Sequence, residues 1–283
     1  MTSPSQAALD LCWAINSPSL VRGADVTSMP LISLESIDQE HLANFLKDQN
    51  VVHRVGGYFE QLIHYWLRHV RNVDVVATGL TLKDDKITVG EIDFLYRDES
   101  DTLVHTEVAV KYYLCAPGTE PSEFPGPNAR DNFEAKSTKL FDKQLAASVG
   151  RVDGVGARHG VLKGMIFYHQ DEPDVARPAR LADGHLRGAW LRATDINTFA
   201  ESDHGYAIAG KPYWLAPCAD AKLLSGAELI EHLNEHFAGQ AHPVMVSKRS
   251  KNGADDAHCE VGRLFVVNDS WPNTQTEGSR PQR

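Results

Sequence analysis

Three strand-like runs follow one another between residues 73 and 114, with only short polar turns between them, and they constrain the fold more than any other part of the chain. The runs cover 73–82, 86–96 and 103–114, and β-branched residues are frequent in them. An amphipathic helix is predicted before them, over 54–70, because its apolar residues recur at helical spacing. A second helix over 130–149 and a buried strand over 161–168 are predicted after them. The order α-β-β-β-α-β predicts an α/β fold.

The flanking segments are expected to elaborate this core. The segment 5–48 is predicted to be helical in two pieces, interrupted by the Pro- and Ser-containing stretch 17–34. The proline-rich segment 115–128 is expected to be a mobile loop. Asn128 or Asp131 is expected to cap the helix that follows it.

The C-terminal part alternates less regularly than the core. Strands are expected near 186–193, 212–216, 243–248 and 261–268, and a helix over 226–238. The chain then divides into a helical segment (1–50), a core (51–170), a mixed α/β elaboration (171–270) and a disordered tail (271–283).

The composition is that of an ordinary water-soluble globular protein, with 42% hydrophobic and 23% charged residues. No apolar run approaches the roughly 20 residues that a membrane helix needs, and the start of the chain lacks the features of a signal peptide. The four cysteines show no C-x-x-C spacing, which favours reduced thiols. We therefore expect a cytoplasmic protein without a membrane partner. The net charge of −10 opposes tight, sequence-independent DNA binding, although carboxylates also accompany metal sites.

Acidic residues lie on two neighbouring predicted strands. Because side chains alternate across a strand, Glu91 and Asp93 share one face of the second strand. Glu107 and Lys111 share a face of the third strand in the same way. Neighbouring strands lie about 4.8 Å apart, so Asp93 and Glu107 can reach one divalent ion. Two carboxylates with water and a substrate phosphate suit Mg²⁺ or Mn²⁺, and such an ion activates a water to attack a phosphodiester.

The alternative is that these acids form the solvated face of a half-buried sheet. Apolar residues fill the opposite face and favour a central location, where an unpaired acid is costly. These residues are Ile92, Phe94, Val108 and Val110.

Polar residues on the two flanking helices are further candidates for the site. Glu60 lies on the flank of the first helix, from which it can reach the edge of the sheet. On the second helix Gln144 falls within the apolar stripe and Lys136 lies at its margin. A polar side chain on a buried face needs partners, which either a core hydrogen bond or an adjacent site would supply.

These residues together resemble the core of the PD-(D/E)XK nuclease superfamily. Within it, residues 8–215 are similar to a bacterial family of domains of unknown function, through the phrases Gly57-Tyr58-Phe59-Glu60, Glu107-Val108-Ala109-Val110-Lys111 and Gly126-Pro127-Asn128-Ala129-Arg130-Asp131. The resemblance implies a restriction-endonuclease-like αβββαβ core and cleavage of DNA with Mg²⁺ or Mn²⁺. It implies that Asp93 and Glu107 bind the metal with Glu60 as an auxiliary acid. Lys111 would position the water, with Gln144 in support and Lys136 contacting the substrate.

The sequence departs from the superfamily pattern at the lysine. The lysine of the pattern follows the acid by two residues, and here that position holds Ala109. Lys111 is on the same face but about 6.6 Å further along the strand. Either Lys111 reaches back, or Lys136 replaces it, or the site is degenerate and the fold serves as a binding or assembly module. Hydrolysis of a nucleotide or of RNA is a further possibility.

One other pattern on the C-terminal helix carries metal-binding residues. His232-Leu233-Asn234-Glu235-His236 matches the H-x-x-E-H order of some zinc peptidases. Three glutamates surround these histidines, so a solvated helix face is the favoured interpretation.

Overall fold

The computed structural model describes residues 4–27, 29–48, 54–116, 124–169, 177–200, 203–218, 222–251 and 258–272. The helices are α1 (Gln6–Asn16), α2 (Gln39–Asp48), α3 (Val55–Tyr65), α4 (Phe133–Thr138), α5 (Ile196–Phe199) and α6 (Gly226–Gly239). The strands are β1 (Asp74–Asp84), β2 (Ile87–Arg97), β3 (Leu103–Cys115), β4 (Val155–His169), β5 (Leu186–Arg192), β6 (His204–Ala209), β7 (Val244–Lys251) and β8 (His258–Val267). The expected order from residue 54 to 169 is therefore present, as α3, β1, β2, β3, α4 and β4.

Two of these helices continue beyond their regular α-helical part. A π-helical turn, Trp66–Val70, extends α3. A π-helical segment, Lys139–Gln144, and a 3-10 turn, Leu145–Ser148, extend α4. The added π turns matter for the site, because each one changes the direction in which the following side chains point around the helix axis.

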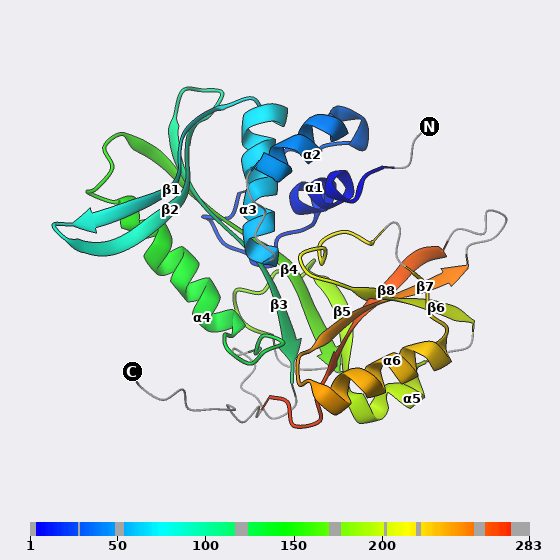
Figure 1. Ribbon diagram of the computed structural model, residues 1–283. Coiled ribbons are helices and arrows are strands. Elements are labelled where there is room, and N and C mark those ends of the chain that lie inside the picture. Colours follow the sequence, from blue (N-terminus) through cyan, green and yellow to red (C-terminus); the bar gives the residue numbers. More distant parts are fainter. Residues whose placement is uncertain are drawn as a thin grey trace.

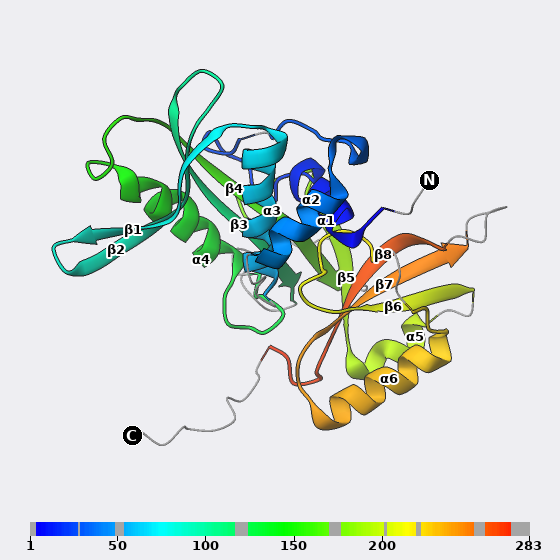
Figure 2. The ribbon, with the colours of Figure 1, turned by 45° about the horizontal axis from the view of Figure 1, so that its top comes forward.

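All eight strands form one mixed sheet, in the order β1-β2-β3-β4-β5-β8-β7-β6. The central strands β3, β4, β5 and β8 run parallel to one another. Antiparallel pairs flank them on both sides: β1 and β2 form a long hairpin, and β7 and β6 continue from β8. The hairpin projects beyond the helices in both views (Figures 1 and 2).

Helices cover both faces of this sheet. α1, α2 and α3 pack on one face, where the largest apolar cluster joins them to β3, β4 and β8. α4 packs on the other face of β3 and β4, and α5 and α6 cover that face further along, over β5 to β8 (Figure 1). β4 is buried on both faces from Gly160 to Tyr168, as expected of a central parallel strand.

A buried lysine fastens α1 to the sheet. Lys163 lies on the α1 face of β4, 6% exposed, and its ammonium donates to the carbonyl of Ile15 at 3.0 Å and to that of Ser17. Burial lowers the pKa of Lys163 to about 8. A cation at this place satisfies backbone carbonyls that the end of a helix leaves unpaired.

The structure differs from the sequence-based expectation in several elements. Residues 212–216 were expected to be a strand, but they form an irregular segment whose Trp214, Leu215 and Ala216 are buried. β6 was not expected. The cap of α4 is Asn132, whose side chain accepts from the Ala135 N–H at 2.7 Å, and neither Asn128 nor Asp131.

Two of the expected segments lie partly outside the described residues. The predicted loop 115–128 overlaps β3 at Cys115, and its residues 117–123 are outside the described part, as are residues 273–283 of the expected tail. Cys12, Cys115 and Cys218 are not in disulfide bonds. In the part of the chain that the structure describes, no helix is long and apolar enough to cross a membrane.

Candidate functional site

Strands β2 and β3 part where the two predicted acids lie. They pair over four residue pairs, the last being Phe94 with Thr106. Beyond this pair, hydrogen bonds from the backbone to side chains take the place of the backbone hydrogen bonds between the two strands. The Val108 N–H donates to Asp93 Oδ2 at 2.8 Å, and the Asp93 N–H donates to Glu107 Oε1 at 3.4 Å. Asp93 and Glu107 therefore lie side by side in a fork between two strands.

Glu107 is fully buried and is held from several sides. Its Oε2 accepts from Gln144 Nε2 at 2.5 Å, and its Oε1 lies 2.8 Å from His105 Nε2. His105 Nδ1 lies 2.9 Å from Ser148 Oγ, which also accepts from Arg158 Nε at 2.9 Å. When Glu107 is ionised, the His105 Nε2–H donates to it and Nδ1 accepts the Ser148 hydroxyl proton. The interpretation of Glu107 as a solvated residue is thereby wrong.

Asp93 is half-buried, and its pKa is raised. Burial, and next the charge of Glu107, raise the pKa of Asp93 from 3.8 to about 7. Its Oδ2 accepts the Val108 N–H, whereas Oδ1 accepts no hydrogen bond from the described residues.

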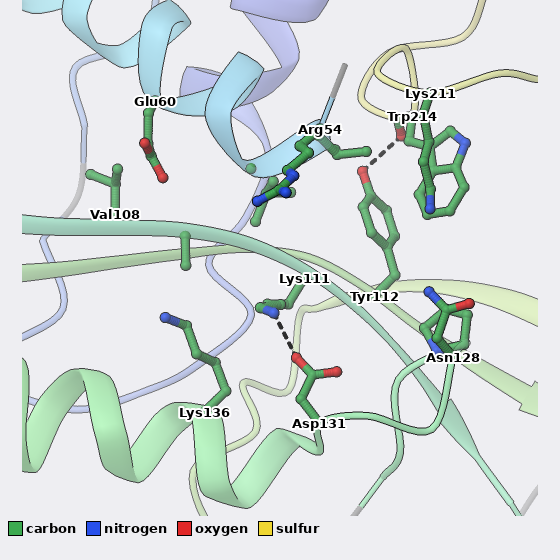
Figure 3. A pocket seen from close by; sticks show the side chains of 15 residues that line it. Arg54, Glu60, Val108, Lys111, Tyr112, Asn128, Asp131, Lys136, Lys211 and Trp214 are labelled. Atoms are coloured by element: carbon green, nitrogen blue, oxygen red, sulfur yellow. Dashed lines mark hydrogen bonds and ion pairs between the residues drawn. The ribbon is translucent and has the colours of Figure 1, made fainter. Parts of the chain in front are cut away.

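Glu60 approaches the fork from α3. Its carboxylate faces Val108 from above β3, and Lys136 comes from α4 on the other side of the strand (Figure 3). Partial desolvation by the surrounding protein, and next the charge of Glu91, raise the pKa of Glu60. Glu91 itself is exposed, so the solvated-face interpretation applies to it.

The two candidate lysines have different partners. Lys111 forms an ion pair with Asp131, at 2.6 Å between Nζ and Oδ2. Lys136 donates to Gln144 Oε1 at 3.4 Å, and Gln144 in turn donates to Glu107. Burial, and next the charges of Lys111 and Lys139, lower the pKa of Lys136. Lys136, rather than Lys111, is the lysine connected to the carboxylates.

An open cavity of about 560 Å³ runs along β3 beside the fork. Its walls come from the start of α3, the strand, the segment before α4 and the irregular segment after β6 (Figure 3). The charged residues that line it are Arg54, Glu60, Lys111, Asp131, Lys136 and Lys211. The candidate site thus combines two carboxylates in a fork with a cavity rich in cations.

The donor set fits a divalent ion in part. Asp93 and Glu107 supply hard oxygen ligands, and Mg²⁺ is commonly held by one or two carboxylates with water completing its shell. Within the described residues no group of three or more His, Cys, Asp and Glu side chains is arranged to hold a metal.

The histidines of the H-x-x-E-H pattern lie on α6. One of them, His236, has a backbone partner, because its Nε2 lies 2.8 Å from the His242 carbonyl oxygen.

Sequence reasoning missed three members of the site network. His105 shares its face of β3 with Glu107 and was detectable from the same alternation. Ser148 and Arg158 gave no signal, because they meet His105 only through the packing of the helix end on β3 and β4.

The comparison with known families gives one match, to a domain of unknown function, DUF1853, over residues 9–267. The chain belongs to this family. The match agrees with the expected domain-of-unknown-function family and carries no link to the PD-(D/E)XK superfamily. No curated protein and no solved structure matches the chain.

Proposed function

We propose that the protein is a metal-dependent nuclease that hydrolyses phosphodiester bonds in DNA. The observation that carries the proposal is the pair of carboxylates in the fork between β2 and β3, where burial, and next the charge of Glu107, raise the pKa of Asp93 to about 7. Two like charges held this close are stabilised by a divalent cation. The order of elements around the fork supports the resemblance to the PD-(D/E)XK core.

The residues have separate roles in this proposal. Asp93 and Glu107 would hold Mg²⁺ or Mn²⁺, with Glu60 as an auxiliary acid. The bound ion supplies Lewis-acid polarisation of the phosphoryl oxygen and a lowered pKa for water. Gln144 orients the buried Glu107 through its 2.5 Å hydrogen bond and accepts from Lys136. Lys136 would donate to the phosphate, and Lys111 adds positive charge further along β3.

A cleavage assay tests the proposal. The protein is incubated with linear, nicked and branched DNA and with Mg²⁺ or Mn²⁺, and products are separated on denaturing gels. We expect metal-dependent cleavage that Asp93→Asn and Glu107→Gln reduce by at least about 100-fold, because each removes a charged ligand. Glu91→Gln, on the same strand and exposed, is the matched control and should retain activity. Cleavage that persists unchanged in Asp93→Asn contradicts the assignment.

A second candidate function is a binding module on a degenerate nuclease fold. Two observations favour it: Ala109 occupies the lysine position of the superfamily pattern, and Lys111 is paired with Asp131. Titration calorimetry with Mn²⁺ discriminates between the two. Binding that is lost in Glu107→Gln favours the nuclease, and absence of binding together with absence of cleavage favours the module.

A further inference from the structure

The cavity beside the fork has the opposite charge to the protein as a whole. Four cations and two acids line it, a local excess of two positive charges, whereas the chain carries a net charge of −10. A long DNA duplex would meet this net negative charge over a wide surface. The cavity, about 560 Å³, is within the size range of sites for small ligands. Positive charge is thus concentrated where one or two nucleotides fit.

Lys136 lies at the fork, whereas Lys111 and Lys211 are displaced from the carboxylates along β3. Lys111 is three residues beyond Val108, at the fork, which corresponds to about 10 Å of strand. Lys211 lies at the far end of the cavity, and its ammonium is 4.8 Å from the centre of the Trp214 ring (Figure 3). The Tyr112 hydroxyl donates to the Trp214 carbonyl at 2.8 Å and fixes this wall to β3. The far end of the cavity is therefore a positively charged surface whose wall is hydrogen-bonded to β3.

The start of α3 faces the same end of the cavity. Arg54 is exposed, points into the cavity (Figure 3) and has no ion pair or side-chain hydrogen bond among the described residues. No side chain caps the helix at this residue, and Val55 and Gly56 line the cavity. A Cβ at Gly56 would have open space around it. The guanidinium and the helix N–H groups are available as donors to an oxyanion.

We propose that this cationic end binds the terminal monophosphate of a nucleic-acid strand, so that hydrolysis at the fork takes place close to a strand end. The inference rests on the proposed nuclease function. A terminal monophosphate carries about −1.5 to −2 charges and three acceptor oxygens, whereas each internal phosphodiester carries one charge. Arg54 at the start of α3 and Lys211 in the segment after β6 line the cavity from two different elements, an arrangement that favours the more highly charged terminal group.

The test measures binding separately from cleavage. The Asp93→Asn protein is titrated in EDTA against one fluorescent single-stranded oligonucleotide with a 5′-phosphate, a 3′-phosphate or no terminal phosphate. We expect one phosphorylated form to bind about tenfold more tightly than the unphosphorylated one. The Arg54→Gln and Lys211→Gln changes should remove this preference, and Arg54→Lys should restore part of it. Arg22→Gln, outside the cavity, should leave it intact.

Two outcomes separate this inference from the proposed function. Equal affinity for all three oligonucleotides, with metal-dependent cleavage of closed circular DNA by the wild-type protein, overturns the inference and leaves the nuclease standing. A terminal-phosphate preference without any metal-dependent cleavage supports the binding site and contradicts the nuclease. Thermal melts of each variant establish that it is folded, so that a lost preference reports the cavity.

Discussion

At the residue scale, the raised pKa of Asp93 shows that the folded protein disfavours the ionised form of this carboxyl group. Its pKa in the folded protein is about 7, against 3.8 for the free group, so the folded state binds this proton more tightly than the unfolded chain. Between about pH 4 and pH 7 the Asp93 charge therefore lowers the free energy of unfolding as pH rises. We expect the melting temperature of the wild-type protein to fall over this range relative to that of Asp93→Asn, as measured by calorimetry.

The same titration predicts how a metal acts on stability. At pH 7.5 a divalent ion binds the ionised pair, so Mn²⁺ should raise the melting temperature of the wild-type protein by a few degrees. At pH 5 protonated Asp93 competes with the ion, and the rise should be smaller. Glu91→Gln should behave as the wild-type protein does. Identical pH profiles for wild-type and Asp93→Asn, with no effect of Mn²⁺ on either, would contradict the assignment of this pair.

Strand residues of the site were predictable, whereas its helix residues were predictable only in part. Alternation within each strand and the short distance between neighbouring strands predicted that Asp93 and Glu107 lie close together, and they do so just beyond the last pair of β2 and β3, Phe94 with Thr106. Lys136 and Gln144 are eight residues apart, with the π-helical segment Lys139–Gln144 between them. A regular 100° step per residue does not describe this segment, so sequence spacing could not give their hydrogen bond.

At the scale of elements, the approach of the α4 extension to β4 depends on Gly160. A Cβ at this position would lie 2.3 Å from a ring carbon of Phe141 and 2.7 Å from Leu140. We expect Gly160→Ala to lower the free energy of unfolding by about 1–3 kcal/mol, because either the helix or the strand must move. Urea denaturation measures this change. Gly262→Ala on β8 is the matched control, since a Cβ there meets no atom within 4 Å. If both changes had the same effect, the result would be decided by the lower conformational entropy of the unfolded chain that alanine causes, and not by the close approach at Gly160.

Gly160 also shows why some elements were not predictable. The strand was expected to begin at residue 161, yet β4 begins at Val155 and includes the glycines at 156 and 160. Glycine marks either a turn or a close approach of two elements, and the sequence does not tell which. The segment 212–216 gave the opposite error, because it was expected to be a strand, whereas its Trp214, Leu215 and Ala216 are buried without forming one. A short apolar run predicts burial more reliably than it predicts conformation.

At the scale of the whole molecule, the N-terminal helices and the last strand belong to one packing unit. The largest apolar cluster contains residues from α1 and α2 as well as from β7 and β8. Asp10 on α1 is fully buried, and it accepts from the Tyr58 hydroxyl on α3 at 3.0 Å and from the Ala216 N–H at 2.8 Å. Burial raises the pKa of Asp10 to about 6. These contacts connect parts of the chain that are more than 200 residues apart.

This connectivity predicts that the chain unfolds in one cooperative transition, although it is longer than most two-state proteins. Leu11 on α1 and Leu264 on β8 are both fully buried, in clusters on opposite faces of the sheet. Leu11→Ala and Leu264→Ala should each cost about 2–5 kcal/mol and lower the midpoint of the same transition. Scanning calorimetry should give a ratio of calorimetric to van't Hoff enthalpy near one for all three proteins. Two separated transitions, each shifted by one substitution alone, would show that the helical N-terminus and the C-terminal strands fold independently across the shared sheet.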